Sequence, residues 1–148
     1  MFSEYQKLVS CQRFHKERLL TLGPDLCAAT FLVSRNCRVK FRDRNNSWVS
    51  REVMFKSGAF LPTSWQPGWY VEAIDASCSD LVYEAFNNMR NLVFLKSLDV
   101  SYCPQMDDWC LDRISGEFQD SLEELDVSGC SRVGLSGLEV RICPLLKK

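Results

Sequence analysis

The chain has 148 residues, of which 46% are hydrophobic and 25% are charged. This composition is typical of a globular domain with one core and excludes an intrinsically disordered chain. The longest apolar run, at 26–33, is far shorter than the ~20 residues that cross a bilayer, so no membrane-spanning segment is expected.

The net charge of −1 conceals a division between two halves of the chain. Residues 1–70 carry eleven Lys/Arg and five Asp/Glu, a balance of +6, whereas residues 71–148 carry seven and fourteen, a balance of −7. Two explanations stay open, because the halves either attract one another or form surfaces for different partners.

The first half predicts helices followed by a strand. Residues 2–22 form a moderately amphipathic pattern that favours a helix, and Gly23-Pro24-Asp25 interrupts it. A second helix is expected from Pro24 to about Ser34, because proline and an acidic residue both suit a first helical turn. Residues 37–42 then alternate apolar and basic side chains, as a half-buried strand does. The candidate buried positions of the first helix are Tyr5, Leu8, Phe14, Leu19 and Leu20.

Residues 44–70 read as irregular, since glycines and prolines interrupt every longer element. Aromatic side chains bury large areas, so we expect this stretch to pack against the segment that follows. Residues 1–70 are therefore interpreted as an N-terminal cap of helices, a basic strand and an aromatic-rich loop. The aromatic residues are Trp48, Phe55, Phe60, Trp65, Trp69 and Tyr70.

The second half contains an internal repeat. Residues 71–77, 95–101 and 122–128 read Val-Glu-Ala-Ile-Asp-Ala-Ser, Leu-Lys-Ser-Leu-Asp-Val-Ser and Leu-Glu-Glu-Leu-Asp-Val-Ser. Ile74 and Leu98 are 24 residues apart, and Leu98 and Leu125 are 27 apart, within the range of leucine-rich repeats. Helix-like patterns follow at 81–86, 106–114 and 133–138. In the second and third copies a cysteine stands two positions after the serine, at Cys103 and Cys130. The predicted fold class is α/β: a short leucine-rich-repeat solenoid of the cysteine-containing type over 71–148, behind the cap.

Alternation along each repeat strand turns the leucines inward and gathers polar residues on the opposite, concave face. Parallel strands lie ~4.8 Å apart, so three aspartates should stack in one column. Either serines and solvent relieve their repulsion, or the column is an acidic stripe that receives basic residues of a partner. The candidate partner-binding residues are Asp75, Ser77, Ser97, Asp99, Ser101, Glu124, Asp126 and Ser128.

A basic cluster lies on the cap: Arg35, Arg38, Lys40, Arg42 and Arg44. Anionic lipid attracts such residues by roughly 1 kcal/mol each, although a simply solvated strand face explains them equally well. Nucleic acid is not an expected partner, because the strand pattern places Phe41 in the core rather than beside the bases.

Catalytic and metal-binding motifs are missing from the sequence. The single histidine, His15, has no nucleophile to activate, and neither a P-loop nor a dinucleotide fingerprint occurs. The eight cysteines include no Cys-x-x-Cys pair, which disfavours a structural zinc site. No secretory segment is evident, so free thiols in a reducing compartment are expected. The chain is predicted to be non-enzymatic.

Several segments resemble a known family. They are Val-Lys-Phe-Arg-Asp at 39–43, Val-Glu-Ala-Ile-Asp-Ala at 71–76, Asp-Asp-Trp-Cys-Leu at 107–111 and Asp-Ser-Leu-Glu-Glu-Leu at 120–125. They are similar to the distal membrane-arm assembly components of mitochondrial complex I, also called ATP synthase subunit s-like proteins. The sister family, ATP synthase subunit s or coupling factor B, is similar too, and Gly-Pro-Asp at 23–25 looks more like that branch. The resemblance covers about 23–138.

The resemblance implies a mitochondrial assembly factor, peripheral to the inner membrane, that binds membrane-arm subunits or assembly intermediates of complex I. Anionic inner-membrane lipid is a further implied partner. Two alternatives remain: a regulator of proton-coupled ATP synthesis of the subunit s type, and a repeat-type substrate adaptor of a ubiquitin ligase. The coupling-factor branch also implies magnesium on main-chain oxygens, at positions that correspond to Asn36 and Ser77 here, although Asn36 replaces a glycine. No targeting segment is evident, and the end after Leu138 looks truncated.

Overall fold

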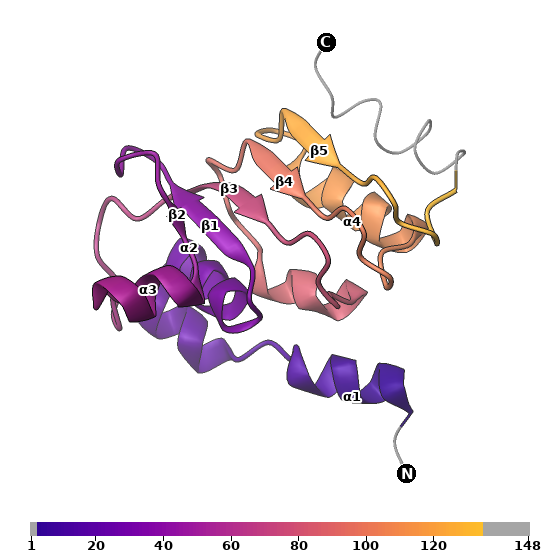
Figure 1. The fold of residues 1–148 in the computed structure, drawn as a ribbon, viewed down its shortest axis with the longest axis horizontal. Coiled ribbons are helices and arrows are strands. Elements are labelled where there is room, and N and C mark those ends of the chain that lie inside the picture. The colour runs from indigo at the N-terminus through magenta and orange to yellow at the C-terminus, as the bar shows by residue number, and fades with distance from the viewer. Residues whose placement is uncertain (1–2, 135–148) are drawn as a thin grey trace.

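The computed structural model describes residues 3–134 as a mixed α/β fold built on one five-stranded sheet (Figure 1). The strands are β1 (Arg38–Phe41), β2 (Trp48–Val49), β3 (Val71–Asp75), β4 (Ser97–Asp99) and β5 (Glu124–Asp126). Their order in the sheet is β2-β1-β3-β4-β5. The predicted cap and the predicted repeats therefore share one sheet.

The two parts of the sheet differ in strand direction. β1 is antiparallel to both β2 and β3, whereas β3, β4 and β5 are parallel to one another. Ile74 lies opposite Leu98, which lies opposite Leu125. This is the alignment that the repeated sequence predicts, and it puts the intervening aspartates in line as well.

Helices cover one face of the sheet (Figure 1). They are α2 (Lys16–Ser34), the 3-10 helix η1 (Tyr83–Asn88) and α4 (Asp108–Phe118); α2 packs on β1 and β3, and η1 packs between α2 and α4. A single core fills the space between the helices and the sheet. It includes the predicted helical positions Leu81, Ala85, Phe86, Met106, Cys110, Leu111 and Ile114. Val82 is also buried, outside this cluster.

The single helix expected over 2–22 is wrong. α1 (Glu4–Cys11) ends early, and α2 begins at Lys16. Between them Gln12 is fully buried: its amide donates to the carbonyl of Asp80 at 2.7 Å and accepts the N–H of Val82 at 2.9 Å. These two hydrogen bonds hold Gln12 against the loop that contains Asp80 and Val82, at the point where the helix is interrupted. The break leaves Tyr5 and Leu20 exposed, against expectation, and α1 stands at the edge of the body (Figure 1).

The predicted interruption at Gly23 is confirmed, although α2 continues beyond it. Gly23 has φ 80° and ψ 171°, a non-helical conformation inside α2. A Cβ on this residue would lie 2.7 Å from Cδ1 of Trp65, so the indole ring packs where only glycine leaves room. Pro24 then opens the second part of the helix.

The segment 44–70 is more ordered than its glycines and prolines predict. It contains β2 and a further helix, α3 (Arg51–Ser57), which Ser50 caps by accepting the N–H of Val53 at 3.2 Å. The expectation that its aromatic residues are buried holds only in part. Trp69 packs on the core, but Phe55 and Phe60 are 67% and 61% exposed.

The third helical pattern falls mainly beyond the described residues. Val133 is partly buried against the core, whereas Leu135, Leu138 and the chain end expected to be truncated lie outside 3–134. Leu125 is only partly buried, because β5 has one neighbouring strand, β4, within the described sheet.

The strand register can be tested by a pair of substitutions in β4. Leu98 is 2% exposed, so Leu98→Ala should lower the free energy of unfolding by ~2–5 kcal/mol through the cavity it leaves. Asp99→Ser should lower it by less than about 1 kcal/mol, because serine can accept the same turn hydrogen bond, more weakly. Urea unfolding measures both. Equal losses would show that the assigned inward and outward faces are wrong.

Asp25 joins α2 to the start of β3 in a buried position. Its carboxylate accepts the backbone N–H of Val71 at 2.8 Å. Burial raises the pKa of Asp25 above its ordinary value of 3.8, although the N–H groups of Val71 and of Asp25 itself oppose the rise. The folded state therefore holds this proton more tightly than the unfolded state does.

A raised carboxyl pKa makes stability fall as pH rises through the interval above 3.8. Asp25→Asn does not ionise, and its side-chain oxygen can still accept from Val71. The stability of the variant relative to the original should therefore increase between acidic and neutral pH. Urea unfolding of both proteins across this range measures the difference, and a difference independent of pH would contradict the assignment.

Candidate functional site

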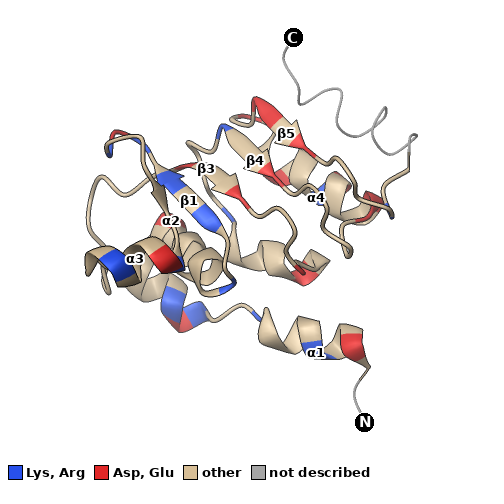
Figure 2. Ribbon diagram, viewed as in Figure 1, with Lys and Arg blue, Asp and Glu red and all other residues tan. Residues whose placement is uncertain are grey.

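The exposed face of the sheet carries two rows of side chains that run across the strands. Arg38 lies opposite Asp75, which is followed by Asp99 and Asp126 on the next strands. The second row consists of Lys40, Ala73, Ser97 and Glu124, of which Ala73 is buried. Basic residues thus lie on β1 and acidic residues on β3 to β5, a division that Figure 2 shows in blue and red.

Asp75 is neutralised within the sheet. It forms an ion pair with Arg38 and accepts the hydroxyl of Ser77 at 2.6 Å. Partial burial opposes its ionisation, but the bonds from Ser77 and Arg38 together hold the pKa of Asp75 below its ordinary value. Within residues 3–134, the other two acids of the expected column, Asp99 on β4 and Asp126 on β5, form no ion pair.

The aspartates of β4 and β5 shape the turns that follow them. Asp99 accepts the N–H of Ser101 at 2.9 Å, and Asp126 accepts that of Ser128 at 2.9 Å. Bonds from the hydroxyl and N–H of Ser128 lower the pKa of Asp126. Ser101 is buried, so it is unavailable to a partner, whereas Asp126, Glu124 and Ser128 are exposed.

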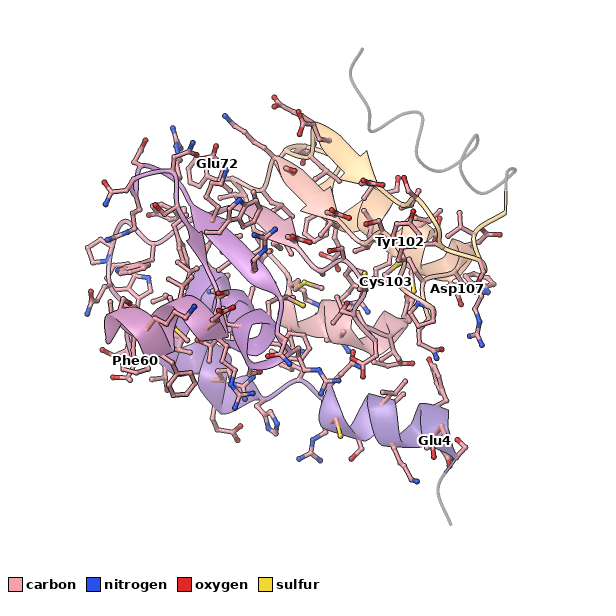
Figure 3. The ribbon with its side chains drawn as sticks, viewed as in Figure 1. Glu4, Phe60, Glu72, Tyr102, Cys103 and Asp107 are labelled. Atoms are coloured by element: carbon pink, nitrogen blue, oxygen red, sulfur yellow. The ribbon has the colours of Figure 1, made fainter. Side chains whose placement is uncertain are left out.

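The cysteines of the repeat bind neighbouring strands. The thiol of Cys103 donates to the carbonyl of Ala76 at 3.1 Å, and that of Cys130 donates to the carbonyl of Val100 at 3.1 Å. Figure 3 labels Cys103 in the loop after β4. The sequence pattern predicts that these cysteines recur in the repeat, but it does not predict this hydrogen bond. Their equal distance from the preceding serine was the available signal.

The predicted basic cluster is not one patch. Arg35 pairs with Asp80 at 2.7 Å beside the turn after α2. Arg38 and Lys40 lie over the ring of Trp48 on the sheet face, at 5.0 and 4.8 Å from its centroid. The other two predicted residues, Arg42 and Arg44, lie beyond β1 and stack on the rings of Phe94 and Trp69.

The turns of Asn36 and Ser77 do come together, in a cleft of about 480 Å³. Both turns contain left-handed residues, Asn36 at φ 64° and Cys78 at φ 59°. Main-chain oxygens suit magnesium, but Arg35 lines the same cleft and already engages its carboxylate, Asp80. A fixed guanidinium repels a cation, so these residues do not fit a resident magnesium ion.

Residues 3–134 contain no group of three or more His, Cys, Asp or Glu side chains that could hold a metal ion. None of the helices in this part of the chain is both long enough and apolar enough to cross a membrane.

Together these features define a mixed α/β protein whose repeated segment builds a sheet with an exposed, charge-divided face. Comparison with known protein sequences shows which proteins the chain is similar to. The chain is 40% identical over 128 residues to "Distal membrane arm assembly component 2" of Drosophila melanogaster. The matched segment covers 86% of this chain and 43% of the relative. The chain is thus similar to this distal membrane arm assembly component, and the resemblance inferred from its motifs is confirmed.

More distant relatives carry another name. "ATP synthase subunit s, mitochondrial" is 26% identical in Bos taurus and 24% identical in Homo sapiens, each over 82% of this chain and 58% of the relative. The chain therefore spans about half the length of the curated relatives it matches. No family model matches it.

The packing of the thiols predicts which cysteines react. Cys11 and Cys78 are exposed, whereas the other five described cysteines are buried. Burial raises the pKa of Cys103, and raises those of Cys37 and Cys110 to about 12. Because the thiolate is the nucleophile, iodoacetamide should modify the two exposed cysteines first under native conditions. Peptide mass spectrometry over time measures the order. Early modification of Cys103 would contradict the packing described here.

Proposed function

We propose that this chain is a non-enzymatic mitochondrial assembly factor that helps to build the distal membrane arm of respiratory complex I by binding other proteins. The observation that carries the proposal is its 40% identity to the Drosophila distal membrane arm assembly component over 86% of the chain. The relatives are named as an assembly component and as subunit s of ATP synthase, and neither name assigns a catalytic role to the protein itself, which supports a role in binding.

The leucine-rich-repeat class of residues 71–148 is part of this proposal. The parallel register of β3, β4 and β5 supports it, as do the recurrent thiol bonds to the preceding strand. A repeat protein presents an extended surface that suits a protein partner.

The binding surface is the acidic half of the exposed sheet face, which we define as Asp99, Glu124 and Asp126. Asp75 does not belong to it, because Arg38 neutralises that carboxylate. Exposed carboxylates attract basic residues and speed their encounter. The partner is accordingly a membrane-arm subunit, or an assembly intermediate, that presents a basic segment.

The proposed location is the mitochondrion, with peripheral attachment to the inner membrane. The word "mitochondrial" in the names of the subunit s relatives supports the compartment. The basic residues of β1 suit contact with an anionic membrane surface. The mechanism uses no metal, in accordance with the guanidinium in the Asn36–Ser77 cleft.

A regulatory role at ATP synthase is the second candidate. The 26% identity to bovine ATP synthase subunit s favours it. The two candidates predict different clients for the same fold, so an experiment on both complexes separates them.

Depletion of the protein should lower assembled complex I and accumulate intermediates that lack the distal membrane arm, with ATP synthase little changed. Native gels of both complexes measure this outcome. A fall in ATP synthase alone would favour the second candidate. Normal levels of both complexes would refute the assembly role. In a separate experiment, proximity labelling that recovers ubiquitin-ligase subunits would favour the adaptor alternative.

Rescue by variants tests the acidic surface separately from the assembly role. Asp99→Ser combined with Asp126→Ser should rescue poorly. A matched control, Glu17→Gln with Asp120→Asn, makes the same charge change at exposed positions outside the sheet and should rescue fully. Full rescue by the first variant would remove the acidic surface from the mechanism and leave the assembly role in place.

A further inference from the structure

A pocket of about 430 Å³ opens beyond the end of β1. It is lined by Arg42, Asp43, Arg44, Gly68 and Tyr70, and so joins the loop after β1 to the segment that leads into β3. Two of its lining residues are arginines, and both are held in place by aromatic rings.

Arg42 is fixed from two directions. Its backbone N–H donates to the carbonyl of Tyr70 at 2.8 Å, which extends the pairing of β1 with β3. Its guanidinium carbon lies 4.3 Å from the ring centroid of Phe94, and that ring makes an edge contact with Tyr70 at 4.9 Å. Stacking fixes the plane of the guanidinium and leaves its edge free to donate hydrogen bonds.

Arg44 is fixed in a similar way. Its guanidinium carbon lies 3.6 Å from the ring centroid of Trp69, and Nε donates to the carbonyl of Gly68 at 3.2 Å. Trp69 in turn meets the buried ring of Phe41 edge-on at 4.9 Å. The terminal amino groups of Arg44 are therefore held by a ring that is itself anchored on the core.

The charge of the pocket is positive. Asp43 is the carboxylate of its lining, but its side chain is 90% exposed and lies 3.8 Å from Nε of Arg42. A contact of this length in water is worth little and yields readily to a better acceptor. The lining contains two guanidinium groups and one carboxylate, so its net charge is positive and attracts an anion.

We propose that this pocket binds a phosphate group, gripped by Arg42 and Arg44. Planar guanidinium groups donate paired hydrogen bonds that match phosphate oxygens, and two fixed groups offer more donors than a single carboxylate accepts. Preorganisation lowers the entropy lost on binding. The phosphate comes either from a phospholipid headgroup or from a soluble phosphate compound. The site stands on this geometry alone and does not depend on the assembly role.

Binding of inorganic phosphate and glycerol phosphate to the full chain can be measured by NMR titration. Binding to vesicles of phosphatidylcholine with phosphatidylglycerol can be measured by sedimentation. Arg42→Gln with Arg44→Gln should weaken the binding by about tenfold or more, because hydrogen bonds between charged groups are lost. Arg42→Lys with Arg44→Lys should also weaken it, since lysine keeps the charge without the planar fork.

The matched control is Arg51→Gln with Lys56→Gln, which removes the same charge from exposed positions on α3. It should change the affinity by less than about twofold, within the weak effect of exposed charges at a distance. Thermal melting checks that every variant is folded. Binding to vesicles alone would identify a headgroup as the source, and binding to the soluble probes would identify a free phosphate compound. Equal weakening by the control, or an acidic peptide bound in place of every phosphate probe, would overturn the proposal, as would no binding at all.

Discussion

The parallel register of β3, β4 and β5 decides which side chains enter the core and which face solvent. Because side chains alternate along a strand, the alignment of Ile74 with Leu98 and Leu125 also fixes which residues face outward. A slip of one residue would bury aspartates and expose leucines. The thiols of Cys103 and Cys130 reinforce the alignment, since they donate to the carbonyls of Ala76 and Val100, each one residue beyond the end of the strand in the preceding repeat. This register therefore determines both the core, which lies between the helices and the sheet, and the charged face on the opposite side of the sheet.

The antiparallel strand β1 continues the same sheet with the opposite charge. Arg38 of β1 forms an ion pair with Asp75 of β3, and this pair lies at the boundary between the basic and acidic halves of the sheet face. This arrangement combines both explanations of the divided charge: the two halves attract one another at β1 and β3, and the charges farther from the boundary remain for partners. The unneutralised acids lie on β4 and β5, and the stacked pair Arg42 and Arg44 lies beyond the other side of that boundary.

A role in assembly suits a surface of this kind. An assembly factor acts by binding and release, so it needs an extended, polar face rather than a catalytic pocket. The described part of the chain offers such a face on a rigid sheet. The matched residues make up 43% of the Drosophila relative and 58% of the bovine one.

The repeat register, the interruption at Gly23 and the resemblance to the assembly component could be predicted from the sequence, because each depends on local periodicity or a short motif. Other features arise from contacts between distant parts of the chain. Gln12 ends α1 because Asp80 and Val82, far along the chain, supply its buried hydrogen-bond partners. The helix α3 and the exposed ring of Phe55 were likewise missed. Periodicity tells which face of an element is apolar, but contacts between side chains distant in sequence depend on which elements the fold brings together, and no local pattern carries that information.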